Sequence, residues 1–129
     1  YGTDYIPYAL ATREFLLAVK IKLSAEGIVV GNVWGLPSNE LYFSMVKTYR
    51  DVFPELHVIR APLSLNHILI SSARRLNLTP RRLVQLAARI ENRLKPPLEL
   101  ARMVEEGYEP VGDLPKDARI LLDADAPKR

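Results

Sequence analysis

The side chains best suited to chemistry occur in two short stretches, the opening loop and the end of an apolar segment. Tyr1, Asp4 and Tyr5 belong to the first stretch, and Asn32 and Trp34 belong to the second. Carboxylates and aromatic ring faces favour cationic ligands. Asp4, Tyr1, Tyr5, Asn32 and Trp34 are therefore the candidate residues of a site, with Asp4 as the carboxylate among them.

Apolar periodicity predicts the elements that must position these side chains. Helical spacing predicts helices over residues 12–24, 39–53 and 80–95, with Thr12 and Thr79 as N-caps of the first and the last. Short β-branched runs predict strands in IVVGNVW, ELHVIRAP and NHILISSA. The first of these runs has the composition of a buried strand in a parallel sheet.

The order helix, strand, helix, strand, strand, helix fits the closing half of an α/β sheet. We expect parallel strands with an antiparallel strand near the edge, followed by C-terminal helices. Residues 1–129 would form one unit, with an extended or poorly ordered tail over 107–129. Ligands of such sheets bind outside the carboxyl ends of the strands, so the opening loop and the end of IVVGNVW would line the site.

The composition excludes several kinds of site. The chain has no cysteine, which rules out a disulfide, a thiolate zinc site and a thiol nucleophile. Its two histidines, His57 and His67, are too few for a His-rich metal site, so we expect no metal and ordinary strand roles for both. No apolar run is long enough to cross a membrane, and a chain without cysteine suits the cytoplasm, where we expect the protein.

The basic residues concentrate in one predicted helix. The net charge is +3 and the isoelectric point is about 9.3. Arg82, Arg89 and Arg93 lie on the helix face opposite Leu83 and Ala87, a pattern typical of an amphipathic helix with a solvated basic face. A surface that binds phosphate or nucleic acid is the alternative, and the lack of interleaved aromatic residues counts against it.

Three segments carry a family resemblance. IPYALATREF is similar to an Ile-Pro-x-x-Leu-x-Thr-x-Glu-Phe run, and LSAEGIVVGNVWG is similar to a Leu-x-x-x-Gly-Val-x-Val-x-Asn strand. ARILLDADAP resembles a closing Leu-Thr-Asp-Asp-x-x-Pro stretch, in which a role for Asp123 and Asp125 stays open. These are features of the spermidine synthase family, the polyamine aminopropyltransferases, especially its bacterial branch. The resemblance is good over residues 1–73 and thin across the basic helix.

The resemblance implies a Rossmann-like fold of the S-adenosylmethionine-dependent methyltransferase type, of which this chain would be the C-terminal half. It also implies aminopropyl transfer from decarboxylated S-adenosylmethionine to putrescine or a similar amine, in an enzyme that is commonly a dimer. A carboxylate must take or hold the proton of such an amine before its nitrogen can attack the carbon beside the sulfonium. Asp4 would match the second acidic position of the family's loop, and Asn32 the polar position at the strand end.

The chain departs from the family pattern at its beginning. The family's glycine-rich cofactor loop and principal catalytic aspartate would fall before Tyr1. These 129 residues by themselves are therefore predicted to be inactive. Either a second copy or the missing N-terminal half would cover the open strand edge. The alternatives are a methyltransferase-like or catalytically inactive relative, and a basic binding module.

Overall fold

The computed structural model describes residues 7–127. Its elements, in chain order, are η1 (Tyr8–Leu10), α1 (Arg13–Lys22), β1 (Ile28–Trp34), α2 (Tyr42–Val52), β2 (Glu55–Arg60), β3 (Asn66–Ser72), α3 (Pro80–Leu94), α4 (Leu100–Gly107), β4 (Tyr108–Glu109) and η2 (Asp123–Asp125). The helices and strands predicted from periodicity are all present, with ends that differ by a few residues.

Capping side chains begin two of the helices where the sequence predicts. The Thr12 hydroxyl accepts a hydrogen bond from the Phe15 amide at 3.3 Å, and the Thr79 hydroxyl accepts one from the Arg82 amide at 3.1 Å. Pro80 occupies the first turn of α3, where its missing N–H costs nothing. Both helix starts are therefore determined locally.

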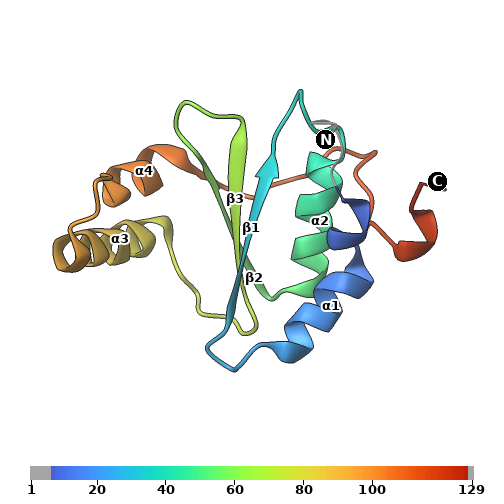
Figure 1. Cartoon of the computed structure of the whole chain (residues 1–129), viewed down its shortest axis with the longest axis horizontal. Helices are drawn as coiled ribbons and strands as arrows, with labels where there is room; N and C mark the ends of the chain where they lie inside the picture. Colours follow the sequence, from blue (N-terminus) through green and yellow to red (C-terminus); the bar gives the residue numbers. More distant parts are fainter. Residues whose placement is uncertain (1–6, 128–129) are drawn as a thin grey trace.

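The sheet has the order β1-β3-β2-β4, and every neighbouring pair is antiparallel (Figure 1). The predicted parallel pairing is therefore wrong. β1 and β2 do run in the same direction, because each is antiparallel to β3, but β3 lies between them and keeps them from pairing. The short connection over residues 61–65 turns the chain straight back from β2 into β3, which places β3 between β2 and the edge strand β1.

β1 is an edge strand, not the buried strand that its composition predicts. Within residues 7–127, no strand pairs with its outer side. Ile28 and Val30 are 54% and 58% exposed, whereas Val33 is 7% exposed. This alternation means that one face of β1 is covered and the other is open.

The covered face of the sheet packs against α1 and α2, which lie together on one side of it in Figure 1. Leu16 of α1, Val46 and Tyr49 of α2, and Val58 and Leu69 of the sheet are buried in one apolar core. Tyr49 comes so close to β1 that a Cβ atom at Gly31 would lie 2.6 Å from its hydroxyl oxygen. A glycine at this position allows helix and strand to pack closely.

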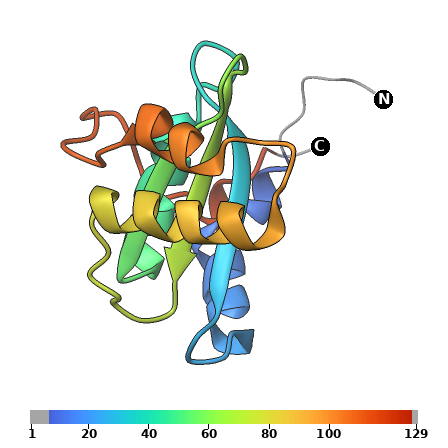
Figure 2. The same ribbon diagram turned by 90° about the vertical axis from the view of Figure 1, so that its left-hand side faces the viewer.

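Helices α3 and α4 pack against each other on the opposite side of the sheet (Figure 2). α4 contacts β2, where Gly107 lies against the Ile59 side chain. On α3 the arginines of the predicted basic face are exposed. Ile90 and Leu94, predicted to share its apolar face with Ala87, are 47% and 69% exposed. The inner face of α3 is therefore only partly covered.

The segment after β4 returns across the sheet to α2. Lys47 Nζ donates to the Ala118 carbonyl at 2.7 Å, and the Thr48 hydroxyl accepts from the Leu121 amide at 3.0 Å. The Leu121 side chain is completely buried in the core formed with α1 and α2. Residues 110–122 therefore contribute to the core although they form no helix or strand.

Candidate functional site

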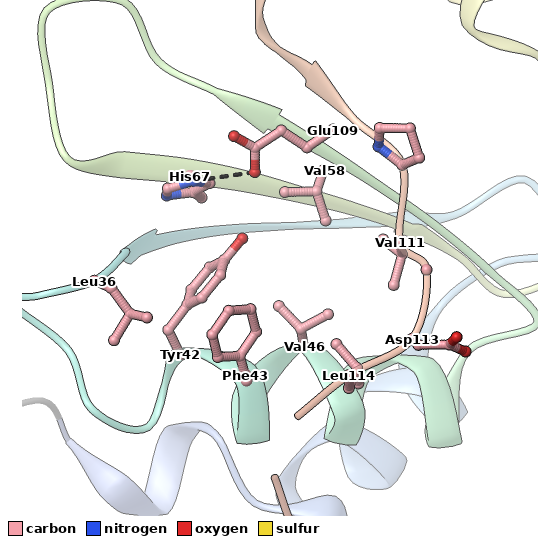
Figure 3. A pocket seen from close by; sticks show the side chains of 12 residues that line it. Leu36, Tyr42, Phe43, Val46, Val58, His67, Glu109, Val111, Asp113 and Leu114 are labelled. Carbon is pink, nitrogen blue, oxygen red and sulfur yellow. Dashed lines mark ion pairs between the residues drawn. The ribbon is translucent and has the colours of Figure 1, made fainter. Parts of the chain in front are cut away.

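A cavity of about 320 Å³ lies between the sheet and the N-terminal half of α2 (Figure 3). Its apolar walls are formed by Leu36, Val46, Val58, Val111 and Leu114, together with the ring of Phe43. The polar side chains that line it are Tyr42, His67, Glu109 and Asp113. An apolar cavity with a few convergent polar groups is the usual form of a small-molecule site.

Strand register brings the polar residues of this cavity to one face of the sheet. Val58 pairs with Glu109 of β4, and Arg60 pairs with His67 of β3. Because Val58 and Arg60 are two residues apart, their partners lie on the same face. This is the face that α2 covers, so Tyr42 and Phe43 of α2 complete the site.

His67 and Glu109 contact each other in the lining of the cavity. His67 Nε2 lies 3.2 Å from Glu109 Oε2, and His67 Nδ1 lies 3.3 Å from the Leu65 carbonyl oxygen. Arg60 Nε lies 3.5 Å from the other carboxylate oxygen of Glu109. Both ring nitrogens of His67 therefore face oxygen atoms of the protein, which holds the ring beside Glu109.

The ring of His67 is held by contacts with Tyr42 and Gly35. Its centroid lies 4.7 Å from that of the Tyr42 ring, with the planes tilted by 47°. The backbone of Gly35 also approaches the ring so closely that any Cβ atom there would collide with the imidazole. The loop after β1 therefore needs glycine at this point to pack against His67.

The Tyr42 hydroxyl points from α2 toward Glu109 (Figure 3). Burial, with a further contribution from the negative charge of Glu109, raises the pKa of Tyr42 to about 12. The phenol therefore stays protonated through the physiological range. It can donate a hydrogen bond or accept one.

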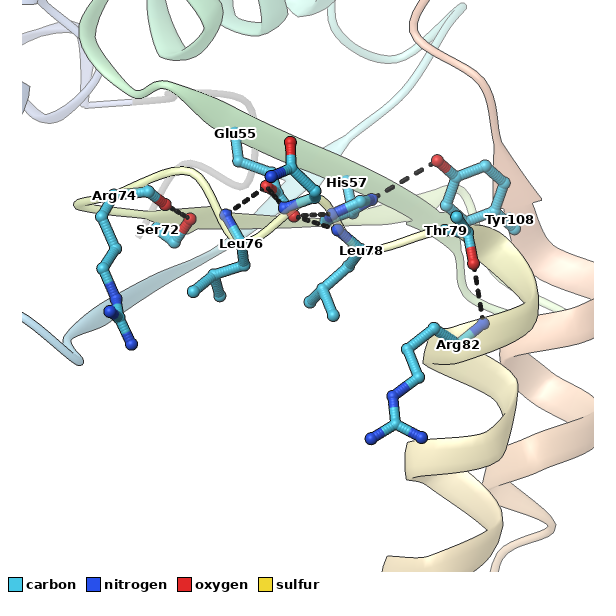
Figure 4. Close-up of polar contacts among 10 residues, drawn as sticks. Glu55, His57, Ser72, Arg74, Leu76, Leu78, Thr79, Arg82 and Tyr108 are labelled. Carbon is cyan, nitrogen blue, oxygen red and sulfur yellow. Dashed lines mark hydrogen bonds and ion pairs between the residues drawn. The ribbon is translucent and has the colours of Figure 1, made fainter.

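A second polar cluster, around Glu55, lies on the other face of the sheet (Figure 4). Glu55 accepts hydrogen bonds from the amides of Leu76 and Asn77 at 2.6 Å and of Leu78 at 3.0 Å. His57 Nε2 lies 2.8 Å from the same carboxylate. Burial alone would raise the pKa of Glu55, but these hydrogen bonds together lower it below its usual value. The cluster ties the segment before α3 to β2 and has a structural role.

The structure describes only one of the two groups of site residues predicted from the sequence. Tyr1, Asp4 and Tyr5 lie outside the described residues. Asn32 and Trp34 are exposed and alternate with buried Val33, so both lie on the open face of β1. The cavity on the α2 side is therefore separate from these two residues.

Sequence reasoning did not single out three of the four polar residues that line the cavity. Tyr42 was part of a predicted helix, and Glu109 and Asp113 fell in the predicted tail. His67 was expected to be an ordinary strand histidine, and it does lie in β3, but it also lines the cavity. Alternation along β3 could have placed His67 on the same face as Leu69, yet its pairing with Glu109 depends on strand order, which no local pattern reveals.

Two further observations concern metal binding and membrane spanning. Across residues 7–127, no three His, Asp or Glu side chains come together in a way that could hold a metal ion. Within the same residues, no helix has both the length and the apolar character needed to span a bilayer.

An antiparallel sheet with helices on both faces makes this an α/β protein, and the cavity beside α2 is its candidate site. The chain is 38% identical, over 72 residues, to a polyamine aminopropyltransferase of Vibrio vulnificus strain CMCP6. The match covers 55% of this chain but 23% of that enzyme, so the chain corresponds to less than a quarter of its relative. No protein-family model matches the chain, and neither does any solved structure. The chain therefore has a spermidine synthase-like relative over about half its length.

Proposed function

We propose that the gene product containing this chain is a polyamine aminopropyltransferase that uses decarboxylated S-adenosylmethionine as donor and putrescine or a similar amine as acceptor. The observation that carries the proposal is the 38% identity over 72 residues to an enzyme of that name. The motifs around Pro7, Thr12 and Asn32 support it as a family resemblance.

The proposed reaction is a nucleophilic substitution. The deprotonated acceptor nitrogen attacks the propyl carbon next to the sulfonium, and a new C–N bond forms as the C–S bond breaks. The bonding pair stays on sulfur, which leaves as methylthioadenosine, and the amine proton passes to a carboxylate and then to water. The enzyme must hold nitrogen and carbon in line for this step.

Asp4 has the role of amine-binding or proton-accepting carboxylate in this proposal. Tyr1 and Tyr5 would contact the aliphatic amine, and Asn32 and Trp34 would contact substrate at the end of β1. The exposure of Asn32 and of Trp34, which is 43% exposed, supports their availability to a ligand.

The decisive experiment incubates the complete gene product with decarboxylated S-adenosylmethionine and putrescine, and follows methylthioadenosine by mass spectrometry. Equal amounts of methylthioadenosine and spermidine are expected. Methyl transfer from S-adenosylmethionine would instead indicate a methyltransferase-like protein, and no product with either donor would indicate an inactive relative.

The role of Asp4 is tested by Asp4→Asn in the same assay, with the exposed Asp117→Asn as matched control. Asp4→Asn should lower kcat/KM for the amine by at least about tenfold, the effect of losing one charge-assisted contact. Unchanged amine kinetics would remove Asp4 from the mechanism.

A further inference from the structure

The end of α3 and the turn into α4 form an exposed surface that is both basic and apolar. Figure 1 shows this surface, which we call the α3 tip, at the edge of the molecule farthest from α1 and α2. The α3 tip consists of the basic residues Arg89, Arg93 and Lys95 and the apolar residues Ile90, Leu94 and Leu98, all of them exposed.

The backbone of the turn holds the α3 tip in one shape. Lys95 ends α3 in the left-handed conformation, with φ of 46°, and its amide donates to the Glu91 carbonyl at 2.8 Å. Pro96 and Pro97 follow, and the proline ring fixes φ. The Glu91 carboxylate accepts a hydrogen bond from the Ala101 amide at 3.1 Å, which ties α3 to α4 across the turn. A surface held in this way loses little conformational entropy when it binds a partner.

The positive charges of the α3 tip are not neutralised by the described part of the chain. Within residues 7–127, neither Arg89, Arg93 nor Lys95 forms an ion pair. The acidic residue that follows the turn, Glu99, lies 3.4 Å from Arg102 Nη1 on α4. The α3 tip therefore attracts a negatively charged partner.

Three aliphatic side chains stand among these charges. Ile90, Leu94 and Leu98 are 47%, 69% and 53% exposed. Their contact with water is unfavourable, so a partner that removes them from water is stabilised. Basic side chains beside exposed aliphatic ones are typical of protein surfaces that bind the interfacial region of a membrane, where the charges meet headgroups and the aliphatic groups meet acyl chains.

We propose that the α3 tip docks on a bilayer that contains anionic phospholipids. The guanidinium groups of Arg89 and Arg93 pair with lipid phosphates, and Leu94 and its aliphatic neighbours enter the boundary between headgroups and acyl chains. The helix lies at the membrane surface and does not cross it, in agreement with the finding that no helix of residues 7–127 could span a bilayer. Docking does not require that the protein catalyse aminopropyl transfer.

The aliphatic residues of the α3 tip favour lipid over nucleic acid. Both partners offer phosphates to arginine, so charge alone does not distinguish them. Bases of a single strand stack on aromatic rings, and α3 contains none. Acyl chains, by contrast, bury leucine and isoleucine side chains, which a phosphate backbone cannot do.

Vesicle sedimentation tests the proposal with the 129-residue chain. The chain should sediment with vesicles of phosphatidylcholine that contain about 30% phosphatidylserine, and not with vesicles of phosphatidylcholine alone. Added salt should weaken the binding, because it screens the arginines from the headgroups. Equal binding to both kinds of vesicle, or none to either, would overturn the proposal. Binding to a single-stranded oligonucleotide without binding to vesicles would also overturn it and would indicate a nucleic-acid surface.

A pair of double variants then tests the position of the surface. Arg89→Gln combined with Arg93→Gln should weaken binding to the phosphatidylserine vesicles by about 25-fold, or about fivefold for each arginine. Arg81→Gln combined with Arg82→Gln is the control: it removes the same charge from exposed residues in the first turn of α3 and should weaken binding by less than about threefold. Equal effects would show that binding follows net charge and not the α3 tip, which would refute the assignment.

The aliphatic contact is tested separately. Leu94→Gln keeps a good helix former at an exposed position and should weaken binding by about fivefold, because a polar side chain does not enter the acyl boundary. Ile21→Gln, at a position of α1 that is 79% exposed, is the matched control and should leave binding unchanged. Unchanged binding of Leu94→Gln would show that no aliphatic side chain is buried and would overturn the proposal.

The outcome separates this proposal from aminopropyl transfer. Methylthioadenosine production without binding to phosphatidylserine vesicles would remove the docking surface and leave the transferase standing. Vesicle binding through the α3 tip without methylthioadenosine production would do the reverse.

Discussion

The Thr48 hydroxyl accepts a hydrogen bond from the Leu121 amide across 73 residues of chain. The same hydroxyl donates to the Ser44 carbonyl at 2.7 Å, and both Thr48 and the Leu121 side chain are fully buried. This contact fixes the C-terminal segment on α2. It thereby helps to position Val111 and Leu114, which form one wall of the cavity.

Replacing Thr48 by valine should test that connection. The substitution keeps the shape of the side chain but leaves the Leu121 amide buried without an acceptor, so it should lower the free energy of unfolding by about 1–3 kcal/mol. Urea denaturation measures the change. Ser44→Ala, which removes a similar bond to the amide of exposed Arg119, is the control and should cost about 1 kcal/mol or less. Equal effects of the two variants would show that burial of the Leu121 contact is unimportant.

The close approach of α2 to β1 predicts that substitutions at Gly31 and Tyr49 have non-additive effects on stability. Gly31→Ala places a methyl group 2.6 Å from the Tyr49 hydroxyl oxygen, so it should destabilise the fold by about 1–3 kcal/mol. Tyr49→Phe removes the atom that clashes. The double variant should therefore be more stable than the sum of the single changes indicates, by about 1 kcal/mol in a denaturation cycle. Strict additivity would mean that the backbone of β1 moves to relieve the clash.

Because one face of β1 is open, replacing two valines of this strand by alanine should lower the free energy of unfolding by different amounts. Val33→Ala should cost about 2 kcal/mol, because the side chain is 7% exposed and lies in the core. Val30→Ala should change the free energy of unfolding by at most about 0.5 kcal/mol, since Val30 is 58% exposed. Thermal and urea unfolding of both variants measure the difference. A large cost at Val30 would indicate that its face is covered in solution.

Local patterns in the sequence predict the elements better than their arrangement. Thr12, Thr79 and Pro80 define helix starts through contacts within one turn, so these starts are readable from the sequence. The position of β3 between β1 and β2 depends on pairing between distant residues, and the apolar composition of β1 suggested a buried strand when it forms an edge. Composition shows that a segment is apolar without showing which neighbour covers it.

The cavity could not be predicted from the sequence either, because long-range strand pairing brings its residues together. His67 and Glu109 are 42 positions apart in the sequence and meet through the strand register of β2 with both β3 and β4. β4 has two residues, too few to produce a periodic signal. By contrast, Asn32 and Trp34 were placed correctly at the end of a strand, and their roles toward substrate remain predictions.

The lowered pKa of Glu55 predicts how the free energy of unfolding depends on pH. Its pKa is lowered from the ordinary value of 4.5, which burial would raise, by hydrogen bonds from His57 and from the amides of Leu78, Leu76 and Asn77. A carboxylate with a lowered pKa in the folded state binds protons more readily when unfolded. Its contribution to stability is therefore complete above the unfolded value and is lost as the pH falls from about 4.5 through the folded pKa.

Glu55→Gln should consequently cost about 2 kcal/mol near neutral pH, because the neutral amide is a weaker acceptor for the three backbone N–H groups. The difference between the two proteins should shrink as the pH falls below 4.5, where the native Glu55 also becomes neutral. Urea unfolding across that range measures both effects. Glu26→Gln is the control: its carboxylate is 75% exposed and pairs with Arg74 at the surface, so the change should cost at most about 0.5 kcal/mol. A difference between wild type and Glu55→Gln that stays constant with pH would mean that the side chain acts through its shape and not its charge.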